Sequence, residues 1–130
     1  MREPNTKLRH LFVYGTLLPG DVRWHRLAPL VVNAGIADHV DGRLFDTGLA
    51  YPAAVFDDAS ASTIVGRTYE LDDVDLALAI LDEIEGTVAG LYHRVQIDTA
   101  RGHRAWSYQY GGDLELTPIQ SGDWTAHRQR

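Results

Sequence analysis

Ten residues near the start of the chain read Leu11-Phe12-Val13-Tyr14-Gly15-Thr16-Leu17-Leu18-Pro19-Gly20. The apolar run at the start of this stretch predicts a buried strand over residues 10–14. Gly15 and Gly20 then let the backbone turn in ways that other residues resist. A strand that ends in a glycine turn leaves several N–H groups unpaired and pointing one way, so the turn can seat a carboxylate or a phosphate. A plain strand followed by a tight loop is the alternative, and this segment alone does not exclude it.

Length and composition are those of one ordinary globular domain. The chain has 130 residues, of which 45% are apolar and 23% charged. A chain of this size buries roughly two-thirds of its unfolded surface, so its core needs no metal or disulfide. We expect residues 1–8 to form a disordered tail and residues 9–125 to form a single domain. The chain has no cysteine, which excludes a disulfide framework, thiolate catalysis and cysteine-based zinc sites.

Charge and motif spacing argue against several classes of function. The formal net charge is −6, and Lys and Arg are scattered rather than clustered with aromatic residues, unlike a nucleic-acid-binding surface. No stretch approaches the roughly 20 apolar residues of a membrane span, and the polar segment 1–7 lacks the apolar core of a signal peptide. The six histidines show neither HxH nor HExxH spacing. We therefore expect a cytoplasmic protein without membrane or nucleic-acid partners and without a metal site. No pattern encodes the oligomeric state.

Short apolar segments separated by turn residues continue through most of the chain. Strands are predicted over 36–45 with a break near Asp41-Gly42, over 51–56, over 64–71 with Gly66 as a bulge candidate, over 91–99 and over 104–110. A short helix is predicted over 22–30 and a longer one over 73–85. About six strands and one or two helices, without strict βαβ alternation, predict an α+β fold: a small mixed β-barrel with helices packed on one side.

The helix predicted over 73–85 ends on an acid that faces the core. Asp72 is its expected N-cap, and Gly86 is the expected residue just beyond its C-terminus. At about 100° per residue, Glu85 falls on the apolar face, whereas Glu83 points to the opposite side. The apolar face carries Val74, Ala77, Leu78, Leu81 and Ile84.

This position of Glu85 has more than one interpretation. A carboxylate on a core-facing stripe is costly unless it is paired or lines a cavity. Partial burial raises the pKa of a carboxyl group, which suits a group that takes and gives protons near neutral pH. Alternatively, the helix end could fray and let Glu85 swing into water, or Glu85 could bond to a buried tyrosine or arginine for stability only.

Together, the glycine turn and this helix resemble the gamma-glutamylcyclotransferase-like family, in particular its gamma-glutamylamine cyclotransferase and AIG2-like branch. The matching segments follow the family's order and span most of the chain. They are Phe12-Val13-Tyr14-Gly15-Thr16-Leu17 with Pro19-Gly20, then Tyr51-Pro52-Ala53, Leu81-Asp82-Glu83-Ile84-Glu85-Gly86, Tyr92-His93-Arg94-Val95 and Ala105-Trp106-Ser107-Tyr108. The combination of Tyr-Gly-Thr-Leu, a helix ending in Glu and a following Tyr-x-Arg makes the resemblance specific.

The resemblance implies a small β-barrel with flanking helices and a cavity at one end, and an enzyme that uses no cofactor. Family members cleave a γ-glutamyl amide without water. The α-amine of the substrate attacks its own γ-carbonyl, which releases 5-oxoproline and an amine or peptide. Glu85 matches the family's catalytic acid and would act as general acid/base. The backbone of Tyr14, Gly15, Thr16 and Leu17 would bind the α-carboxylate of the small-molecule substrate.

Other matching positions have roles that are implied less directly. Tyr92 matches a family aromatic near the acid and could donate its hydroxyl to the acid or substrate, or could be a tyrosine of the barrel core. Tyr51 and Pro52 would shape the pocket rim, and Arg94 would pair with a carboxylate of the barrel. The chain departs from the pattern at Trp24, where relatives often carry Asn before His, and we expect Trp24 to reshape the pocket entrance.

Two other functions stay open at the level of sequence. A non-catalytic module of this fold could bind a small molecule or a partner, or the γ-glutamyl group could pass to another acceptor in a biosynthetic pathway. The presence of Glu85 favours the catalytic function, because a family member that had lost its activity would be expected to lose this acid. The leaving amine or peptide is not named by any motif.

Overall fold

The apolar run of the N-terminal stretch forms β1 (His10–Val13), a central strand of the sheet. The computed structural model describes residues 8–21, 23–49, 51–57, 59–86 and 91–128; residues 1–7, most of the predicted tail, lie outside these ranges. The other strands are β2 (Ile36–Asp46), β3 (Pro52–Phe56), β4 (Thr63–Glu70), β5 (Tyr92–Asp98), β6 (Arg104–Tyr110) and the two-residue β7 (Thr117–Pro118). The helices are α1 (Trp24–Leu27), the 3₁₀ helix η1 (Ala28–Leu30), α2 (Val74–Ile84) and α3 (Trp124–Arg128).

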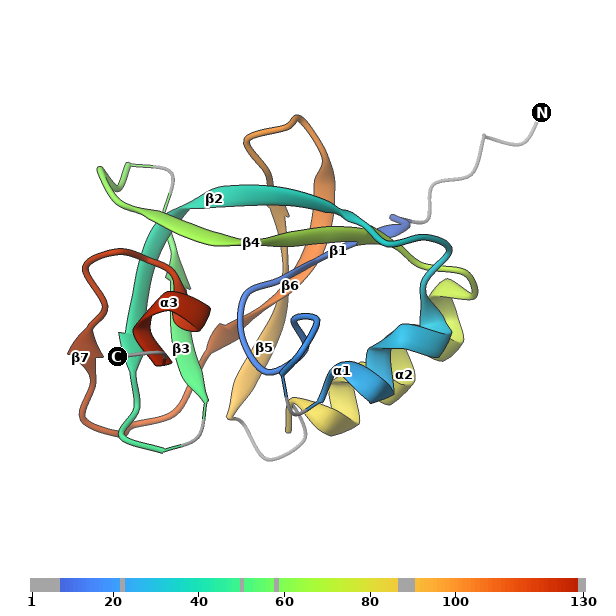
Figure 1. Ribbon diagram of the computed structural model, residues 1–130. Helices are drawn as coiled ribbons and strands as arrows, with labels where there is room; N and C mark the ends of the chain where they lie inside the picture. Colours follow the sequence, from blue (N-terminus) through green and yellow to red (C-terminus); the bar gives the residue numbers. More distant parts are fainter. Residues whose placement is uncertain (1–7, 22, 50, 58, 87–90, 129–130) are drawn as a thin grey trace.

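The strands form a mixed sheet that curls into a nearly closed barrel (Figure 1). Its order is β3-β2-β4-β1-β6-β5, with β7 paired to β2. β1 is parallel to β6 and antiparallel to β4. Where the two ends of the sheet meet, the Phe56 N–H donates to Gln109 Oε1 at 3.0 Å and the Tyr92 hydroxyl donates to the Pro52 carbonyl at 2.6 Å. The predicted α+β barrel of about six strands is therefore confirmed.

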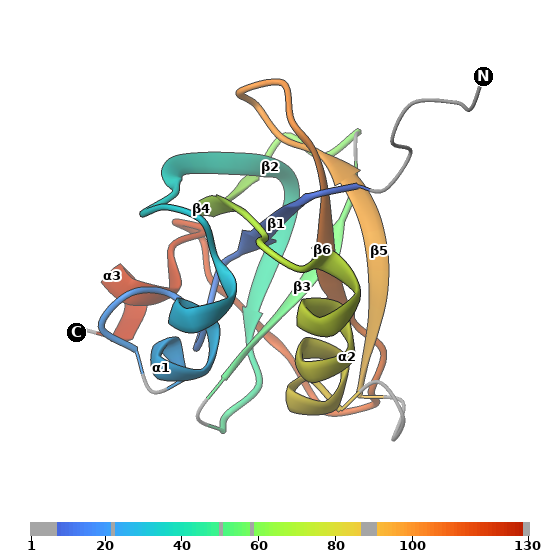
Figure 2. The ribbon, with the colours of Figure 1, turned by 90° about the vertical axis from the view of Figure 1, so that its right-hand side faces the viewer.

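Both faces of β1 are buried, because successive side chains of a strand point to opposite sides. Leu11 and Val13 pack in a cluster beneath α1 and α2, whereas Phe12 packs with Tyr14 in a second cluster that includes Trp124 of α3. Figures 1 and 2 show α1 and α2 at one end of the barrel, whereas α3 contacts β2, with His127 Nε2 2.7 Å from an Asp46 carboxylate oxygen. The strand thus joins two cores, which explains its unbroken apolar sequence.

Two details of the strand predictions are wrong. The predicted break near Asp41-Gly42 is absent, because β2 runs on through Asp46; instead, Gly42 marks the point where β2 changes its partner from β4 to β3. A side chain at Gly42, whose φ is 155°, would collide with the Val55 carbonyl and Ile64. Gly66 makes no bulge, since the β2–β4 register is continuous through it; it is small because a Cβ there would strike the Val13 carbonyl.

The predicted helices form with shorter or shifted ends. α1 and η1 lie within the predicted segment 22–30, of which residue 22 lies outside the described ranges. α2 ends where expected, with Gly86 at a φ of 71° just beyond Glu85. Its N-cap is Asp73, whose carboxylate accepts from the Leu76 N–H at 3.2 Å, rather than Asp72.

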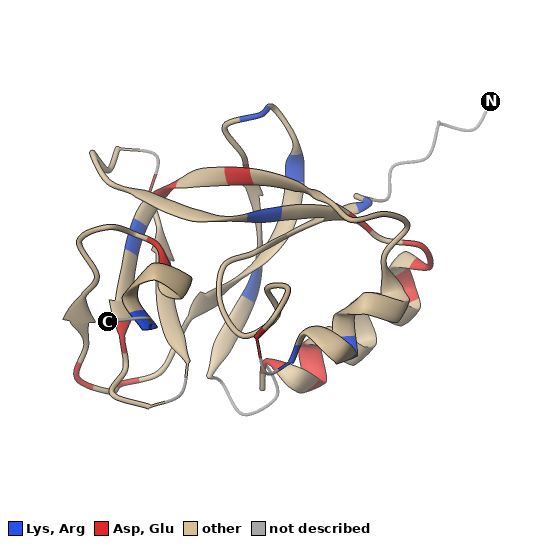
Figure 3. Ribbon diagram, in the orientation of Figure 1, with Lys and Arg blue, Asp and Glu red and all other residues tan. Residues whose placement is uncertain are grey.

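Charged residues are spread over several strands and helices of the described chain rather than gathered on one element (Figure 3). No helix among the described residues has the length and apolar character that crossing a membrane requires.

Candidate active site

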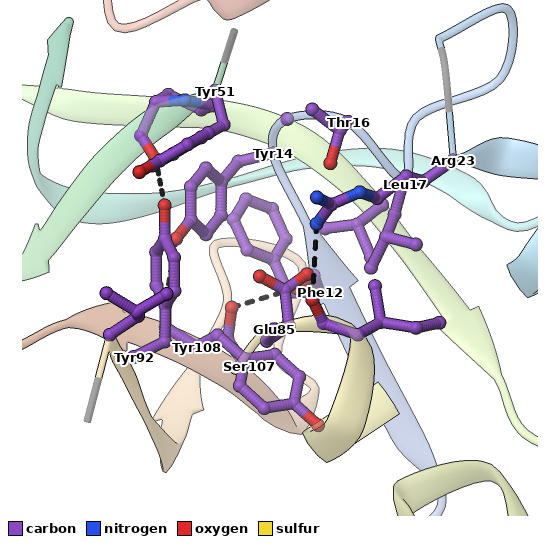
Figure 4. Close-up of a pocket in the computed structure, with 15 residues that line it drawn as sticks. Phe12, Tyr14, Thr16, Leu17, Arg23, Tyr51, Glu85, Tyr92, Ser107 and Tyr108 are labelled. Atoms are coloured by element: carbon purple, nitrogen blue, oxygen red, sulfur yellow. Dashed lines mark hydrogen bonds between the residues drawn. The ribbon is translucent and has the colours of Figure 1, made fainter. Parts of the chain in front are cut away.

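A cavity opens where the carboxyl end of β1 meets the last turn of α2 (Figure 4). About 90 Å³ is open to the centres of water molecules, whereas one buried water needs only about 10–15 Å³ on that measure, so the cavity has room for a small molecule. The described residues that line it are Phe12, Val13, Tyr14, Gly15, Thr16, Leu17, Arg23, Tyr51, Pro52, Ile84, Glu85, Leu91, Tyr92, Ser107 and Tyr108. All seven site residues that the sequence predicted lie in this wall.

In the turn after β1, the backbone hydrogen bonds found among the described residues use the carbonyl groups of Gly15 and Thr16 but no N–H group of residues 15–17. The Gly15 carbonyl accepts from the Leu18 N–H at 2.9 Å, and the Thr16 carbonyl accepts from the Arg23 N–H at 2.8 Å. Within the described ranges, no acceptor is found for the backbone N–H groups of Gly15, Thr16 and Leu17. Since buried N–H groups are nearly always paired in native proteins, these three donors lining a cavity are suited to an anionic ligand.

The two glycines of the turn act in different ways. Gly20 has a φ of 85°, as the expected turn requires. Gly15 has no positive φ; instead, a Cβ there would lie 2.7 Å from Pro52 Cγ. Gly15 is therefore needed for close packing of the turn against the start of β3, a reason that the local sequence did not indicate.

Glu85 is the C-terminal cap of α2 and lies in the middle of the cavity view, between Arg23 and Tyr92 (Figure 4). Its backbone N–H still donates to Leu81 at 2.9 Å, so the helix holds the residue in place rather than fraying before it. The residue keeps a little exposure, but its carboxyl group is enclosed by protein. This burial raises the pKa of Glu85 to about 7, although the nearby Arg23 guanidinium opposes the rise. Glu83, which helix geometry placed on the opposite side of α2, is exposed.

Two tyrosines of the cavity, Tyr14 and Tyr92, already use their hydroxyl protons in hydrogen bonds. Tyr14 donates to the Tyr108 carbonyl at 2.6 Å, and Tyr92 donates to the Pro52 carbonyl at 2.6 Å. Burial and the neighbouring Glu85 raise the pKa values of Tyr14 and Tyr92. For Tyr92, this bonding supports the role of a barrel-core tyrosine over that of a donor to Glu85. Tyr51 lies at the cavity and meets the Tyr92 ring edge-on, with centroids 6.2 Å apart.

Arg23 is the main site residue that the sequence did not reveal. It lines the cavity and donates from Nη1 to the carbonyl of Ile84, the last residue of α2, at 3.2 Å. Its neighbour Trp24 does not line the cavity, contrary to expectation, and packs on Tyr69 with ring centroids 5.4 Å apart. Trp24, where the chain departs from the family pattern, therefore does not form part of the cavity wall, whereas its neighbour Arg23 does.

Arg94 anchors α2 rather than lining the cavity. Its guanidinium lies 3.4 Å from an Asp82 carboxylate oxygen and stacks over Trp106 at 4.8 Å. The other Asp82 oxygen accepts from the Tyr108 hydroxyl at 2.7 Å. These bonds tie the last turn of α2 to β5 and β6 and so fix the direction of Glu85. Among the described residues, no three His, Asp or Glu side chains gather as a metal site would require.

A family model described as gamma-glutamyl cyclotransferase, AIG2-like, matches residues 11–126. The chain belongs to this family. The match includes every residue of the cavity wall, so the turn, Glu85 and Arg23 all lie within the family domain.

Known relatives agree with this assignment. A protein of Halalkalibacterium halodurans that is provisionally named a gamma-glutamylcyclotransferase is 36% identical over 92 residues, which cover 66% of this chain and 80% of the relative. The solution structure of protein ytfP from Escherichia coli is 34% identical, covers 92% of this chain and 98% of its own, and superposes with a TM-score of 0.61. Protein PH0828 of Pyrococcus horikoshii shares the fold at a TM-score of 0.72, with 24% identity and 93% coverage of both chains.

Proposed function

We propose that this protein releases 5-oxoproline from a γ-glutamyl amine or peptide, with Glu85 as general acid/base. The observation that carries the proposal is the pairing, in one cavity, of an enclosed carboxyl group whose pKa is raised to about 7 with a turn of available N–H donors. A γ-glutamyl group needs both features, because it brings an α-carboxylate to be held and an α-ammonium group to be deprotonated.

The turn would hold the substrate by its α-carboxylate. The backbone N–H groups of Gly15, Thr16 and Leu17, for which no acceptor is found in the described ranges, would donate to it. Hydrogen bonds to a charged acceptor are roughly twice as strong as neutral ones. Holding one end of the substrate leaves its α-amine beside Glu85 and its γ-carbonyl free to approach the amine.

Proton transfer through Glu85 then balances the reaction. The ionised Glu85 takes a proton from the α-ammonium group, and because burial raises the pKa of Glu85 toward that of an amine, the transfer costs less than it would with an ordinary carboxylate. The freed amine attacks the γ-carbonyl carbon and forms the five-membered ring. The bond from that carbon to the leaving nitrogen breaks as protonated Glu85 gives its proton to that nitrogen. The ionised Glu85 then takes the second proton from the ring nitrogen and passes it to the released amine, which leaves as an ammonium ion. No water is consumed. Because the amine and the γ-carbonyl belong to one molecule, most of their relative orientation is fixed before they react.

The test is a panel of γ-glutamyl amines and γ-glutamyl dipeptides, with 5-oxoproline measured by mass spectrometry. Wild-type protein should convert at least one member. Glu85→Gln keeps the shape of the side chain but cannot carry a proton, so kcat should fall by about 10²- to 10⁴-fold.

Glu83→Gln is the matched control, because it removes the same charge from the exposed side of the same helix turn and should leave kcat unchanged. Absence of 5-oxoproline from every substrate would overturn the proposed activity. Equal rates for Glu85→Gln and wild type would instead overturn the role of the acid and leave the activity standing.

A further inference from the structure

Arg23 joins the two halves of the cavity. Its backbone N–H closes the turn through the Thr16 carbonyl at 2.8 Å, and its guanidinium reaches the Ile84 carbonyl at the end of α2 at 3.2 Å. The side chain therefore lies between the available N–H donors of the turn and the residue that precedes Glu85. Figure 4 shows it on the same side of the cavity as Thr16 and Leu17.

Among the described residues, most of the guanidinium donors of Arg23 have no acceptor. A guanidinium carries five N–H donors in a fixed planar fork, and in the described part of the chain the bond to Ile84 is its one hydrogen bond. Of the Lys and Arg residues in the described ranges, Arg23 alone lines the cavity. A partly buried arginine with spare donors is suited to bind a carboxylate in two-pronged fashion.

Arg23 and Glu85 are close but not joined. The positive charge of Arg23 acts on Glu85, yet among the described side chains no ion pair within 4.0 Å links them. The cavity thus offers a positive group and a proton-accepting group with space between them. An α-amino acid carries its carboxylate and its ammonium on one carbon atom, so one such molecule can meet both groups at once.

We propose that Arg23, together with the N–H groups of the turn, binds the α-carboxylate of the substrate and so restricts this protein to γ-glutamyl compounds whose α-carboxylate is unblocked. This proposal rests on the proposed function for its substrate. Without Arg23, the turn would bind the carboxylate through backbone N–H groups alone. The proposal also fixes the orientation of the bound molecule, with its carboxylate toward α1 and its amine toward the end of α2.

The kinetic test compares two forms of one substrate from the panel, one with a free α-carboxylate and one with that group converted to a primary amide. Wild type should prefer the free acid strongly in kcat/KM. Arg23→Gln should reduce this preference by about 10- to 100-fold, the size expected for one charge-assisted pair, mainly through a higher KM for the acid. Arg23→Lys keeps the charge without the fork and should restore part of the preference.

Arg26→Gln is the control, because Arg26 is exposed on the same short helix, and it should keep the wild-type preference. An unchanged preference in Arg23→Gln, with activity intact, would overturn the role of Arg23 and leave the proposed function untouched.

A binding experiment separates this inference from catalysis. Titration of the protein with 5-oxoproline, followed by NMR, should shift the amide signals of residues 15–17, and the apparent Kd should weaken by about tenfold or more in Arg23→Gln. Equal binding by both variants, or no binding by wild type, would overturn the inference even if wild type makes 5-oxoproline. Binding that weakens in Arg23→Gln would support it even if no substrate in the panel is converted.

Discussion

Ionisation of the buried Glu85 should lower the free energy of unfolding, and the loss should depend on pH. Burial raises its pKa in the folded protein from 4.5 to about 7, so the folded state holds the proton more tightly than the unfolded state does. Stability from this group is therefore fully present below about pH 4.5 and is lost as pH rises through about 7. An ionised, enclosed carboxylate at neutral pH is thus a local destabilisation that the proposed reaction requires.

We expect Glu85→Gln to gain stability relative to wild type as pH rises. Because Gln does not titrate, the difference in the free energy of unfolding between the two proteins should shift toward Gln by on the order of 2 kcal/mol between pH 5 and pH 8. Urea denaturation at the two pH values measures it. Glu83→Gln, on the exposed side of α2, should show no such shift, and a constant difference for Glu85→Gln would mean that the carboxyl group ionises normally.

At the scale of single residues, the sequence predicted correctly those side chains whose direction follows from regular helix geometry. Glu85 follows Leu81 by four residues, so its face could be read from a regular helix. Arg23 was not identified from the sequence because it precedes α1, a helix of only four residues that is too short to define a face. The hydroxyl partners of Tyr14 and Tyr92 lie 94 and 40 residues away, and no local pattern encodes such bonds.

At the scale of elements, α2 is the part of the site that capping and charge pairs hold in place. Asp73 caps its first turn, and Asp82 ties its last turn to Arg94 and Tyr108. Asp72 and Asp73 are adjacent acids with equal capping propensity. The sequence therefore predicted an N-cap at this point of the chain, but the prediction named Asp72 instead of Asp73. Only the backbone conformation distinguishes them.

We expect Asp73→Ala to lower the free energy of unfolding by about 1 kcal/mol, because the Leu76 N–H loses its acceptor. Chemical denaturation of both single variants measures the effect. Asp72→Ala removes the same charge one residue earlier without removing the cap and should cost clearly less. A larger loss from Asp72→Ala than from Asp73→Ala would contradict the assigned cap.

At the scale of the whole molecule, the barrel closes by side-chain bonds rather than by a complete ladder. The bonds from Tyr92 to Pro52 and from Phe56 to Gln109 bridge the two ends of the sheet. Strand count and fold class were predictable from the spacing of apolar segments and turns. The partner change at Gly42 was not, because it depends on Val55 and Ile64 from other strands.

We expect Tyr92→Phe to lower the free energy of unfolding by about 1–3 kcal/mol, since the buried Pro52 carbonyl would lose its donor. Tyr51→Phe is the matched control: in the described ranges no hydrogen bond of the Tyr51 hydroxyl is found, so its loss should be smaller. Equal stability of Tyr92→Phe and wild type would show that this bond does not hold the barrel closed.

We propose that Glu85 and the turn at residues 14–17 cyclise the γ-glutamyl group rather than hydrolyse it. The most direct measurement is mass spectrometry of the product formed in ¹⁸O-labelled water from a substrate that the panel identifies. We predict that wild type forms 5-oxoproline that carries no ¹⁸O and that Glu85→Gln forms almost none. Glutamate that carries ¹⁸O in its γ-carboxylate would contradict it, because water would then be the nucleophile.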